Sequence, residues 1–598
     1  MPLLSHASLR LLACCFSLIG CTAAHADPSA SRSPNIVLLV VDDMGFSDIG
    51  AFGSEIETPS IDSLASQGVR FSNFHATAAC APTRATLLTG VDHHLAGVGN
   101  MVDTTPLSQK WSPRYQGVLN QRVVTIAQLL RDAGYRTSVA GKWHLGDTRQ
   151  NLPPARGFDR SVIQADSGSD NFEMRPYLPT KAQAYWYEDG QELTSLPEDF
   201  YSSRFFVDKT IDYLRENQDS GKPFFAYVAF QANHTPVQVP RLFRERYQGR
   251  YDQGWDVLRN ERRQRVIEQG LLPRESKAGG EALASWESLT NQQRAYEARK
   301  MEVYAGMATA MDQEVGRLVD YLQRTGQFDN TLFVFLSDNG GSATDPNTSV
   351  IFRQWLDWKY DQSFERLGEK GTWTAIGPNW ASVANAPLAG HKFMASEGGI
   401  RVPMIISGPG LKIRAQITPA MTHIADIAPT ILEVAGVKPP AGNYAGREVE
   451  VMRGSSLLPL VRGESASAHA PDKAIGYELA GNSAVFRGNH KLLRNLPPAG
   501  DNQWHLYDLS RDPGETTDLR EQLPELYAQL QDEYRKYVEE VGVLPMPEGY
   551  NYKRQVQINT LVFFYLPRLV WFLSGGLILV LGFRWLWRRW RRNRLQAQ

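Results

Sequence analysis

The fold class follows from the stretch Asn35-Ile36-Val37-Leu38-Leu39-Val40-Val41, which runs directly into Asp42-Asp43. Its hydrophobicity is continuous rather than alternating, which indicates a strand buried on both faces, as in a parallel sheet. A second run of this kind, Thr331 to Leu336, ends at Ser337-Asp338-Asn339. Further strand candidates lie at Pro223 to Phe230 and Pro403 to Ser407, and helical patterns at Pro59 to Gln67, Val124 to Ala133 and Ser202 to Arg215. This alternation predicts an α/β domain with a central, mostly parallel sheet.

The sequence changes character near Glu448, and its 598 residues are too many for one domain of ordinary size. A helical pattern from Leu523 to Val538 follows short strand-like runs at Ala474 to Tyr477, Ser483 to Arg487, His490 to Leu493 and His505 to Asp508. These runs predict a smaller α+β subdomain, and the prolines after Leu544 mark a linker. We therefore expect a large α/β domain at 34–447, the α+β subdomain at 448–543, the linker at 544–560, an apolar segment at 561–587 and a basic tail at 588–598.

The first 26 residues have the pattern of an export signal. Arg10 precedes the apolar run Leu11 to Ile19, and Ala24-His25-Ala26 offers a small-residue cleavage site. The stretch Leu18-Ile19-Gly20-Cys21 also resembles a lipoprotein signal, so processing at Cys21 is an alternative to cleavage after Ala26. Both routes place the body of the protein outside the cytoplasm.

The C-terminal apolar segment predicts a membrane anchor. Residues 561 to 583 are largely apolar, interrupted at Pro567 and Arg568, and barely reach the roughly 20 residues that span a bilayer. Six arginines interleaved with tryptophans follow, and such arginines favour the cytoplasmic side of a membrane. We expect one span with a cytoplasmic C-terminus, so that the body lies on the periplasmic or extracellular face of the cell membrane. An amphipathic anchor lying in the interface is the alternative.

The charge distribution argues against nucleic acid as a partner. The net charge is −1, but Arg10 and the seven arginines after Thr560 stand in segments without acids. The remaining 55 basic residues face 64 acidic ones, so the body is near −9 and should not bind nucleic acid by charge. The polar stretch from Arg241 to Glu297 predicts a helical surface insertion without a chemical role.

Only one of the four cysteines, Cys80, lies outside the first 26 residues, so cleavage after Ala26 would leave no internal disulfide. It opens the run Cys80-Ala81-Pro82-Thr83-Arg84-Ala85-Thr86-Leu87-Leu88-Thr89-Gly90. A lone cysteine at the head of a helix, with an arginine four residues on, is a candidate reactive centre. A buried, inert thiol is the alternative.

The two buried strands predict a metal site. One ends in a pair of carboxylates, Asp42 and Asp43, and the other in a carboxylate and an amide, Asp338 and Asn339. These side chains offer only hard oxygen ligands, which suit Ca²⁺ or Mg²⁺ and argue against zinc. Ligands gather outside the carboxyl ends of strands in open α/β sheets. For one such pair alone, turn chemistry would be the alternative.

The Cys80 run resembles the signature C-x-P-x-R-x4-T-G of the type I, formylglycine-dependent sulfatases and matches it at every fixed position. Three further elements match the family in order, namely the block Gly141-Lys142-Trp143-His144-Leu145-Gly146, His234 after a strand, and Lys392 before Glu397-Gly398-Gly399-Ile400-Arg401-Val402-Pro403. The similarity extends over about residues 33 to 542 and looks most like the bacterial arylsulfatases. Thr235-Pro236 departs from the aromatic residue expected after the histidine, which leaves the leaving-group specificity open.

The resemblance implies an alkaline-phosphatase-like fold, with a central mixed sheet flanked by helices, and hydrolysis of sulfate monoesters to an alcohol or phenol plus sulfate. It also implies that a separate maturation enzyme oxidises Cys80 to formylglycine, whose hydrate attacks sulfur, beside one calcium ion. The implied metal ligands are Asp42, Asp43, Cys80 in its modified form, Asp338 and Asn339. The implied catalytic residues are Cys80, Arg84, Lys142, His144 as base, and His234 with Lys392 at the leaving group.

Other functions are compatible with parts of this pattern. A phosphonate monoester or phosphodiester hydrolase of the same superfamily is one alternative, because motifs are shared across chemistries on one fold. A non-catalytic, membrane-anchored sulfate-ester binding protein is another. A cysteine-dependent phosphatase fits poorly, since three residues rather than five separate Cys80 from Arg84. The natural ester and the oligomeric state are not evident from the sequence.

Overall fold

The computed structural model describes residues 33–280 and 284–595. The predicted export signal, with both of its candidate processing sites, lies outside the described residues.

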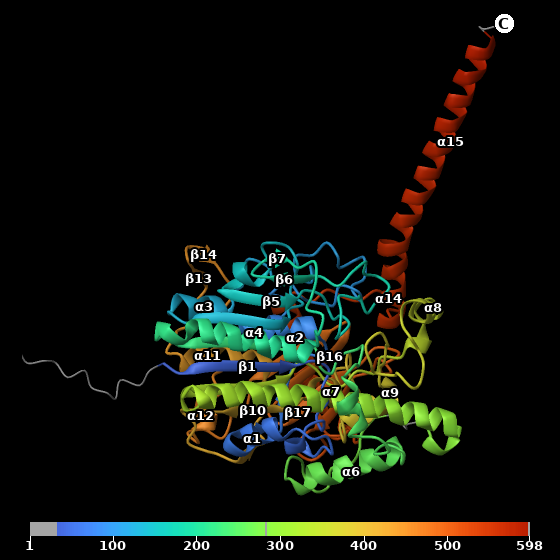
Figure 1. Ribbon diagram of the computed structural model, residues 1–598. Coiled ribbons are helices and arrows are strands. Elements are labelled where there is room, and N and C mark those ends of the chain that lie inside the picture. The colour runs from blue at the N-terminus through green and yellow to red at the C-terminus, as the bar shows by residue number, and fades with distance from the viewer. Residues whose placement is uncertain (1–32, 281–283, 596–598) are drawn as a thin grey trace, which may run out of the picture. The chain divides into compact units, whose positions relative to one another are not determined.

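The core of the chain is a ten-stranded mixed sheet (Figure 1), with strand order β11-β2-β10-β9-β1-β8-β4-β5-β6-β7. The five central strands β9, β1, β8, β4 and β5 run parallel, whereas β10 and β6 run antiparallel to their neighbours. The strands are β1 (Asn35–Val41), β2 (Val69–Phe71), β4 (Arg136–Lys142), β5 (Arg160–Gln164), β6 (Trp186–Glu188), β7 (Gln191–Glu192), β8 (Phe224–Ala229), β9 (Thr331–Ser337), β10 (Met404–Ser407) and β11 (Gln416–Thr418). The parallel centre confirms the expectation from the two continuous apolar runs.

Strand β1 explains why those runs do not alternate. All seven of its residues are buried, and alternate side chains enter two different hydrophobic clusters, one on each face of the sheet. Helices α2 (Cys80–Thr89), α3 (Ile126–Asp132), α11 (Ile427–Val434) and α12 (Leu458–Val461) cover one face. Helices α1 (Pro59–Gln67), α4 (Ser202–Asn217), α6 (Trp255–Glu268), α7 (Asn291–Arg324) and α9 (Gly377–Ala384) cover the other. The short helix α5 (Arg241–Glu245) packs on α7, and α8 (Val350–Lys359) forms a small cluster of its own.

The polar stretch from Arg241 to Glu297 is helical, as expected, but it is more than a surface insertion. Arg262 of α6 is fully buried, and its guanidinium lies 2.5 Å from Asp48 and 2.8 Å from Glu55. Asp48 in turn accepts a hydrogen bond from Tyr304 of α7. The insertion therefore braces the segment that follows β1.

The C-terminal part forms a second, four-stranded antiparallel sheet, with strand order β15-β16-β17-β18 and helix α13 packed against it. Its elements are β15 (Ala474–Leu479), β16 (Asn482–Arg487), β17 (His490–Arg494), β18 (His505–Asp508) and α13 (Pro524–Val541). Buried Lys491 joins this sheet to the large one, because its Nζ lies 2.8 Å from Glu397 of α10 (Glu397–Ile400) and 2.7 Å from Glu515. Glu515 also accepts a hydrogen bond from the backbone N–H of Glu397.

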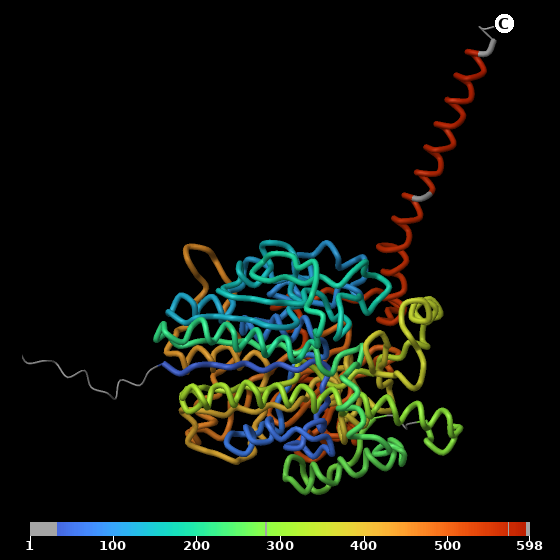
Figure 2. The backbone as a smooth tube through the Cα atoms, in the orientation of Figure 1, coloured from blue at the N-terminus to red at the C-terminus, as the bar shows by residue number. Residues whose placement is uncertain are grey.

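The segment expected as a linker is partly helical and docked. Helix α14 (Tyr552–Thr560) leads through a π-helical turn (Leu561–Tyr565) into α15 (Leu566–Leu595). Among the described residues, this continuous stretch, Tyr552–Asn593, is the one helix long and apolar enough to cross a membrane. The apolar part of α15 is not buried against the rest of the described chain, and its course is clearest in Figure 2.

Candidate active site

Most of the predicted site residues stand at or just beyond the ends of four neighbouring strands of the parallel centre, in the order β9, β1, β8 and β4. Asp42 and Asp43 follow β1, and Asp338 and Asn339 follow β9, whose Ser337 pairs with Val41. Lys142 is the last residue of β4, and His234 lies five residues beyond β8. Since the carboxyl ends of parallel strands meet at one edge of a sheet, these side chains converge there.

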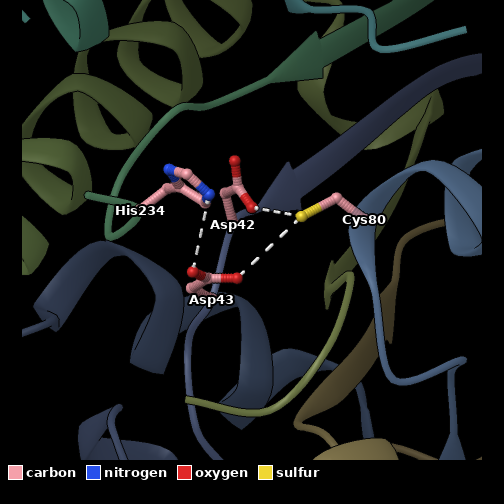
Figure 3. Close-up of side chains that lie close together, drawn as sticks. All are labelled: Asp42, Asp43, Cys80 and His234. Carbon is pink, nitrogen blue, oxygen red and sulfur yellow. Dashed lines mark hydrogen bonds and ion pairs between the residues drawn. The ribbon is translucent and has the colours of Figure 1, made fainter. Parts of the chain in front are cut away.

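Cys80 is the first residue of α2, and its side chain points toward Asp42 and Asp43 (Figure 3). Its Sγ lies 3.3 Å from Oδ1 of Asp42, 4.0 Å from Oδ1 of Asp43 and 3.1 Å from Nζ of Lys392. Ala79 at the N-cap gives the helix no side-chain cap, so the first N–H groups of α2 are open to an anion beside Cys80.

Three cations face three carboxylates at the site. Arg84, one turn after Cys80, donates from Nε and Nη2 to one oxygen of Asp338, at 2.9 and 2.7 Å. Nζ of Lys142 lies 2.5 Å from Asp42, and Nζ of Lys392 lies 2.6 Å from Asp43. Five of these six groups are almost fully inaccessible to solvent, and the side chain of Lys392 is 7% exposed. Burial of so many charges is tolerable only because they are paired.

The electrostatics keep the unmodified thiol inert. Burial raises the pKa of Cys80, and the carboxylates of Asp338 and Asp42 raise it further, against the opposing charges of Lys142 and Lys392. Because the thiolate is the reactive form, this cysteine as translated is a poor nucleophile at neutral pH. Burial would also raise the pKa of Asp43, but the charges of Lys392, His234 and Lys142 outweigh it and lower that pKa.

Within the described residues, the site contains unpaired oxygen atoms that could bind a hard cation. Oδ2 of Asp43 and Oδ1 of Asn339 are buried and have no hydrogen-bond partner among the described residues. Asn339 donates from Nδ2 to Oδ1 of Asp43 at 2.7 Å, and the backbone N–H of Asp43 donates to Oδ1 of Asp338 at 3.4 Å, so these three residues are in direct contact. Orphaned carboxylate and amide oxygens of this kind fit Ca²⁺ or Mg²⁺.

Two histidines border the cluster. His144 is partly exposed, has a left-handed φ of 56°, and its Nδ1 is buried without a partner among the described residues. Burial and the charges of Lys142 and Arg84 hold its pKa well below the ordinary value. His234 donates from Nδ1 to the carbonyl of Thr235 at 2.6 Å, and its Nε2 lies 3.8 Å from Asp43. Burial, followed by the charge of Lys142, lowers the pKa of His234 to about 3.

Several tyrosines at the site were not expected from the sequence, since none stands in a motif. The ring of Tyr177 meets that of His234 edge-on at 5.3 Å between centroids. Tyr227 lies 3.4 Å from Nη1 of Arg84, which donates to it. Tyr304 donates to the carbonyl of Asp43 at 3.2 Å, and thereby supports that residue in its left-handed conformation, φ 60°.

A sequence model of the family described as Sulfatase matches residues 34–437, more than half of the chain. This chain belongs to the sulfatase family. A second model, described as N-sulphoglucosamine sulphohydrolase, C-terminal, matches residues 389–542, which include the four-stranded sheet. The mixed sheet described above is therefore the alkaline-phosphatase-like fold of sulfatases.

Known sulfatases align along most of the chain. An uncharacterized sulfatase of Schizosaccharomyces pombe is 39% identical over 87% of this chain and 96% of its own length. An arylsulfatase of Klebsiella aerogenes is 36% identical over 75% of this chain and 96% of its own length. The crystal structure of Ps i-CgsB in complex with k-i-k-neocarrahexaose has the same fold, with a TM-score of 0.62 and 23% identity over 90% of this chain and 99% of that one. The protein is a sulfuric ester hydrolase whose substrates are sulfate esters.

Proposed function

We propose that this sulfatase is of the arylsulfatase type and hydrolyses sulfate monoesters with a formylglycine made from Cys80 and one calcium ion. The observation that carries the proposal is the position of Cys80 Sγ, within 3.3 Å of both Asp42 and Lys392 at the head of α2. A group oxidised at this atom would stand between carboxylates that suit a metal and cations that suit a sulfate.

The residues that would hold calcium are Asp42, Asp43, Asp338 and Asn339, together with the modified side chain of Cys80. Bound calcium would supply positive charge to the sulfate and to the attacking oxygen. The formylglycine hydrate would supply one hydroxyl to attack sulfur and a second to release sulfate afterwards. The orphaned oxygens of Asp43 and Asn339 support this ligand set.

Arg84, Lys142 and Lys392 provide the positive charge that a sulfate group requires. Arg84 fixes Asp338 through two hydrogen bonds to one oxygen and also donates to the carbonyl of Lys142 at 2.9 Å, so it locks α2 to the ends of β9 and β4. Lys142 and Lys392 stand beside Cys80, where positive charge in a water-poor site stabilises an anionic transition state strongly. The open N-terminus of α2 adds to this field.

The two histidines have different proton roles. His144 is neutral at pH 7, because burial and nearby cations lower its pKa, and a neutral imidazole can take the proton of the second hydroxyl. His234 uses Nδ1–H on a backbone carbonyl, so its Nε2 donates a proton only when the ring is protonated. Burial alone would lower the pKa of Lys392, but the carboxylate of Asp43 raises it well above its ordinary value, so Lys392 is the charged hydrogen-bond donor at the leaving group.

We propose the domain boundaries and the membrane topology that the sequence predicts. Residues 1–26 direct export, 34–447 form the catalytic domain, 448–543 the C-terminal subdomain, and 561–587 a membrane span with a cytoplasmic basic tail at 588–598. The catalytic domain then faces the periplasm or the cell exterior. Full-length protein should fractionate with membranes and resist a high-salt wash, since salt weakens only the electrostatic part of membrane binding. Release of the protein by salt alone would indicate a helix that lies in the membrane interface instead of a membrane span.

The test of the chemistry is direct. Mass spectrometry of the tryptic peptide Phe71 to Arg84, which holds a single cysteine, should show the aldehyde in active preparations. The Cys80→Ala variant should fold and have no measurable turnover of 4-nitrophenyl sulfate. Full activity of this variant would end the formylglycine proposal, and faster turnover of a nitrophenyl phosphodiester by the parent would favour the phosphodiesterase alternative.

A further inference from the structure

The base of the C-terminal helix is docked against one loop, residues 101–112, which we call the collar loop. Asn559 of α14 donates to the carbonyls of Asp103 and Thr105, at 2.8 and 3.0 Å. Lys110 places its Nζ 3.6 Å from the ring centroid of Phe563, at the start of the apolar segment. The collar loop therefore lies at the level where that segment leaves the body of the protein.

The collar loop exposes large apolar side chains at this level. Trp111 is 86% exposed, Leu107 59% and Val102 53%. The neighbouring helix also exposes apolar side chains, among them Leu566, Leu569 and Val570. Since Lys110 of the loop contacts Phe563, exposed apolar side chains of the loop and of the helix lie in adjoining segments, and exposed apolar surfaces mark membrane or partner contacts.

Basic residues border the same surface. Lys553 and Arg554 on α14 are exposed, Arg568 stands in the first turn of α15, and Lys110 belongs to the collar loop. The chain carries no acidic residue between Asn551 and its end. Basic residues at the edge of an apolar segment suit anionic lipid headgroups, because each is attracted to the negative membrane surface. Charge and apolarity together select a lipid surface rather than a protein as the occupant.

The segment that carries Lys392 contacts the helix at the base of this surface. Tyr552 of α14 stacks on Phe393, with 5.2 Å between ring centroids, and Phe393 follows directly after Lys392. The side chains of Lys392 and His234 are each 7% exposed, whereas those of Asp42, Arg84 and Lys142 are fully inaccessible, so Lys392 and His234 lie nearer the protein surface than these three residues do. Phe393 therefore links Lys392, the proposed substrate lysine, to α14.

We propose that the collar loop seats in the membrane interface beside the anchor, so that the active site opens at the lipid surface and acts preferentially on sulfate esters of amphiphiles held in the bilayer. This inference rests on the proposed function, since it requires both sulfate ester hydrolysis and an inserted helix. An amphiphile would present its sulfate at headgroup level, within reach of Lys392, without leaving the membrane.

The test uses the full-length protein in phosphatidylcholine vesicles that contain cholesteryl sulfate, with 4-nitrophenyl sulfate as the soluble substrate. The L107S/W111S variant removes two apolar side chains of the collar loop. The matched control, L242S/V257S, removes two exposed apolar side chains, 67% and 41% exposed, from α5 and α6. Helix α6 lies far from α14 and the start of α15 in Figure 1.

The collar variant should keep its turnover of the soluble ester and lose at least about tenfold in kcat/KM on the vesicle substrate, because burial of two large apolar side chains in lipid is worth more than one factor of ten. The control variant should match the parent on both substrates. Equal behaviour of the two variants on vesicles would overturn the proposal.

A second measurement does not depend on activity. A fluorophore attached at Leu107→Cys in the reconstituted protein should be quenched by phosphatidylcholine brominated on its acyl chains, and the same label at Leu242→Cys should not. Absence of quenching at position 107 would overturn the location of the collar loop. Failure of the parent to hydrolyse 4-nitrophenyl sulfate would instead count against the proposed function, and quenching would still decide where the loop lies.

Discussion

Replacing Lys491 by methionine should loosen the contact between the four-stranded sheet and the loop that carries Lys392. Lys491 is fully buried and lies between Glu397 and Glu515, at 2.8 and 2.7 Å. Methionine has nearly the same length, so the substitution removes the charge with little change of volume. Removing one partner of a buried ion pair costs about 3–5 kcal/mol, because the other charge stays behind unpaired. Here two carboxylates would stay behind, with Arg401 at 3.3 Å from Glu397 as partial compensation.

The loss should depend on pH in a defined direction. Burial raises the pKa of Glu515, the charge of Lys491 opposes this, and Glu397 raises it again, to about 7 in total, against an ordinary value of 4.5. A carboxyl with a raised folded-state pKa binds more protons when folded, so its favourable contribution is present at low pH and is lost as pH rises through about 7. In the Lys491→Met variant the carboxylates of Glu397 and Glu515 repel each other at high pH. At lower pH Glu515 is protonated, which removes the repulsion and reduces the destabilisation by ~1–2 kcal/mol.

The assay is thermal unfolding of the detergent-solubilised protein, followed by tryptophan fluorescence at about pH 5.5 and about pH 8. A cooperative unit of this length converts 1 kcal/mol into roughly 1 °C, so Lys491→Met should lower Tm by about 3–5 °C at the higher pH and by less at the lower one. Lys536→Met is the matched control, because Lys536 pairs with Glu533 at 2.9 Å but is 68% exposed. Such a pair contributes ~0–1 kcal/mol. Equal effects of the two substitutions, or a larger loss at low pH, would refute the reasoning.

Three further outcomes follow from the active site. Arg84→Lys should lower kcat/KM by at least about 10²-fold with an unchanged circular dichroism spectrum, because lysine cannot hold Asp338 and the Lys142 carbonyl together. Asp338→Ala, or exhaustive chelation, should lower kcat/KM at least about 10²-fold, and activity that survives chelation would count against the calcium site. His234→Ala should affect nitrophenyl sulfate least and alkyl sulfates most, since only an alkoxide needs a proton. Equal losses on both esters would mean that His234 binds sulfate instead.

The centre of the fold was predictable from the sequence because strands buried on both faces appear as continuous apolar runs. Strands β1 and β9 are covered on both faces, so their residues are apolar except Asn35, Thr331 and Ser337 at the strand ends, and each run stops where the chain reaches the site. Strand β4 was missed, because its sequence Arg-Thr-Ser-Val-Ala-Gly-Lys is small and polar although all but Arg136 are buried. Its side chains pack under helices whose positions no local pattern reveals.

The site was predictable only where residues stand in motifs. Cys80, Arg84 and the two acidic pairs converge as expected, because motif spacing reflects strand ends and helix starts. Tyr177 and Arg262 reach their partners from distant segments, and nothing in their neighbourhood distinguishes them from ordinary surface residues. The sequence predicts a linker where α14 begins, because contacts such as that of Asn559 with the collar loop are tertiary and leave no local pattern.

The balance of charge at the site couples metal binding to substrate binding. Asp42, Asp43 and Asp338 are matched by Arg84, Lys142 and Lys392, so the protein alone presents the substrate with a nearly neutral pocket. A bound dication would leave the pocket with a net positive charge, which a sulfate monoester, with one negative charge, would partly neutralise. Since opposite charges interact strongly where water is excluded, the ester should bind the metal-loaded enzyme far better than the apoenzyme. Loss of the metal should therefore raise KM as well as lower kcat, whereas a metal that acted only on the attacking oxygen would change kcat alone.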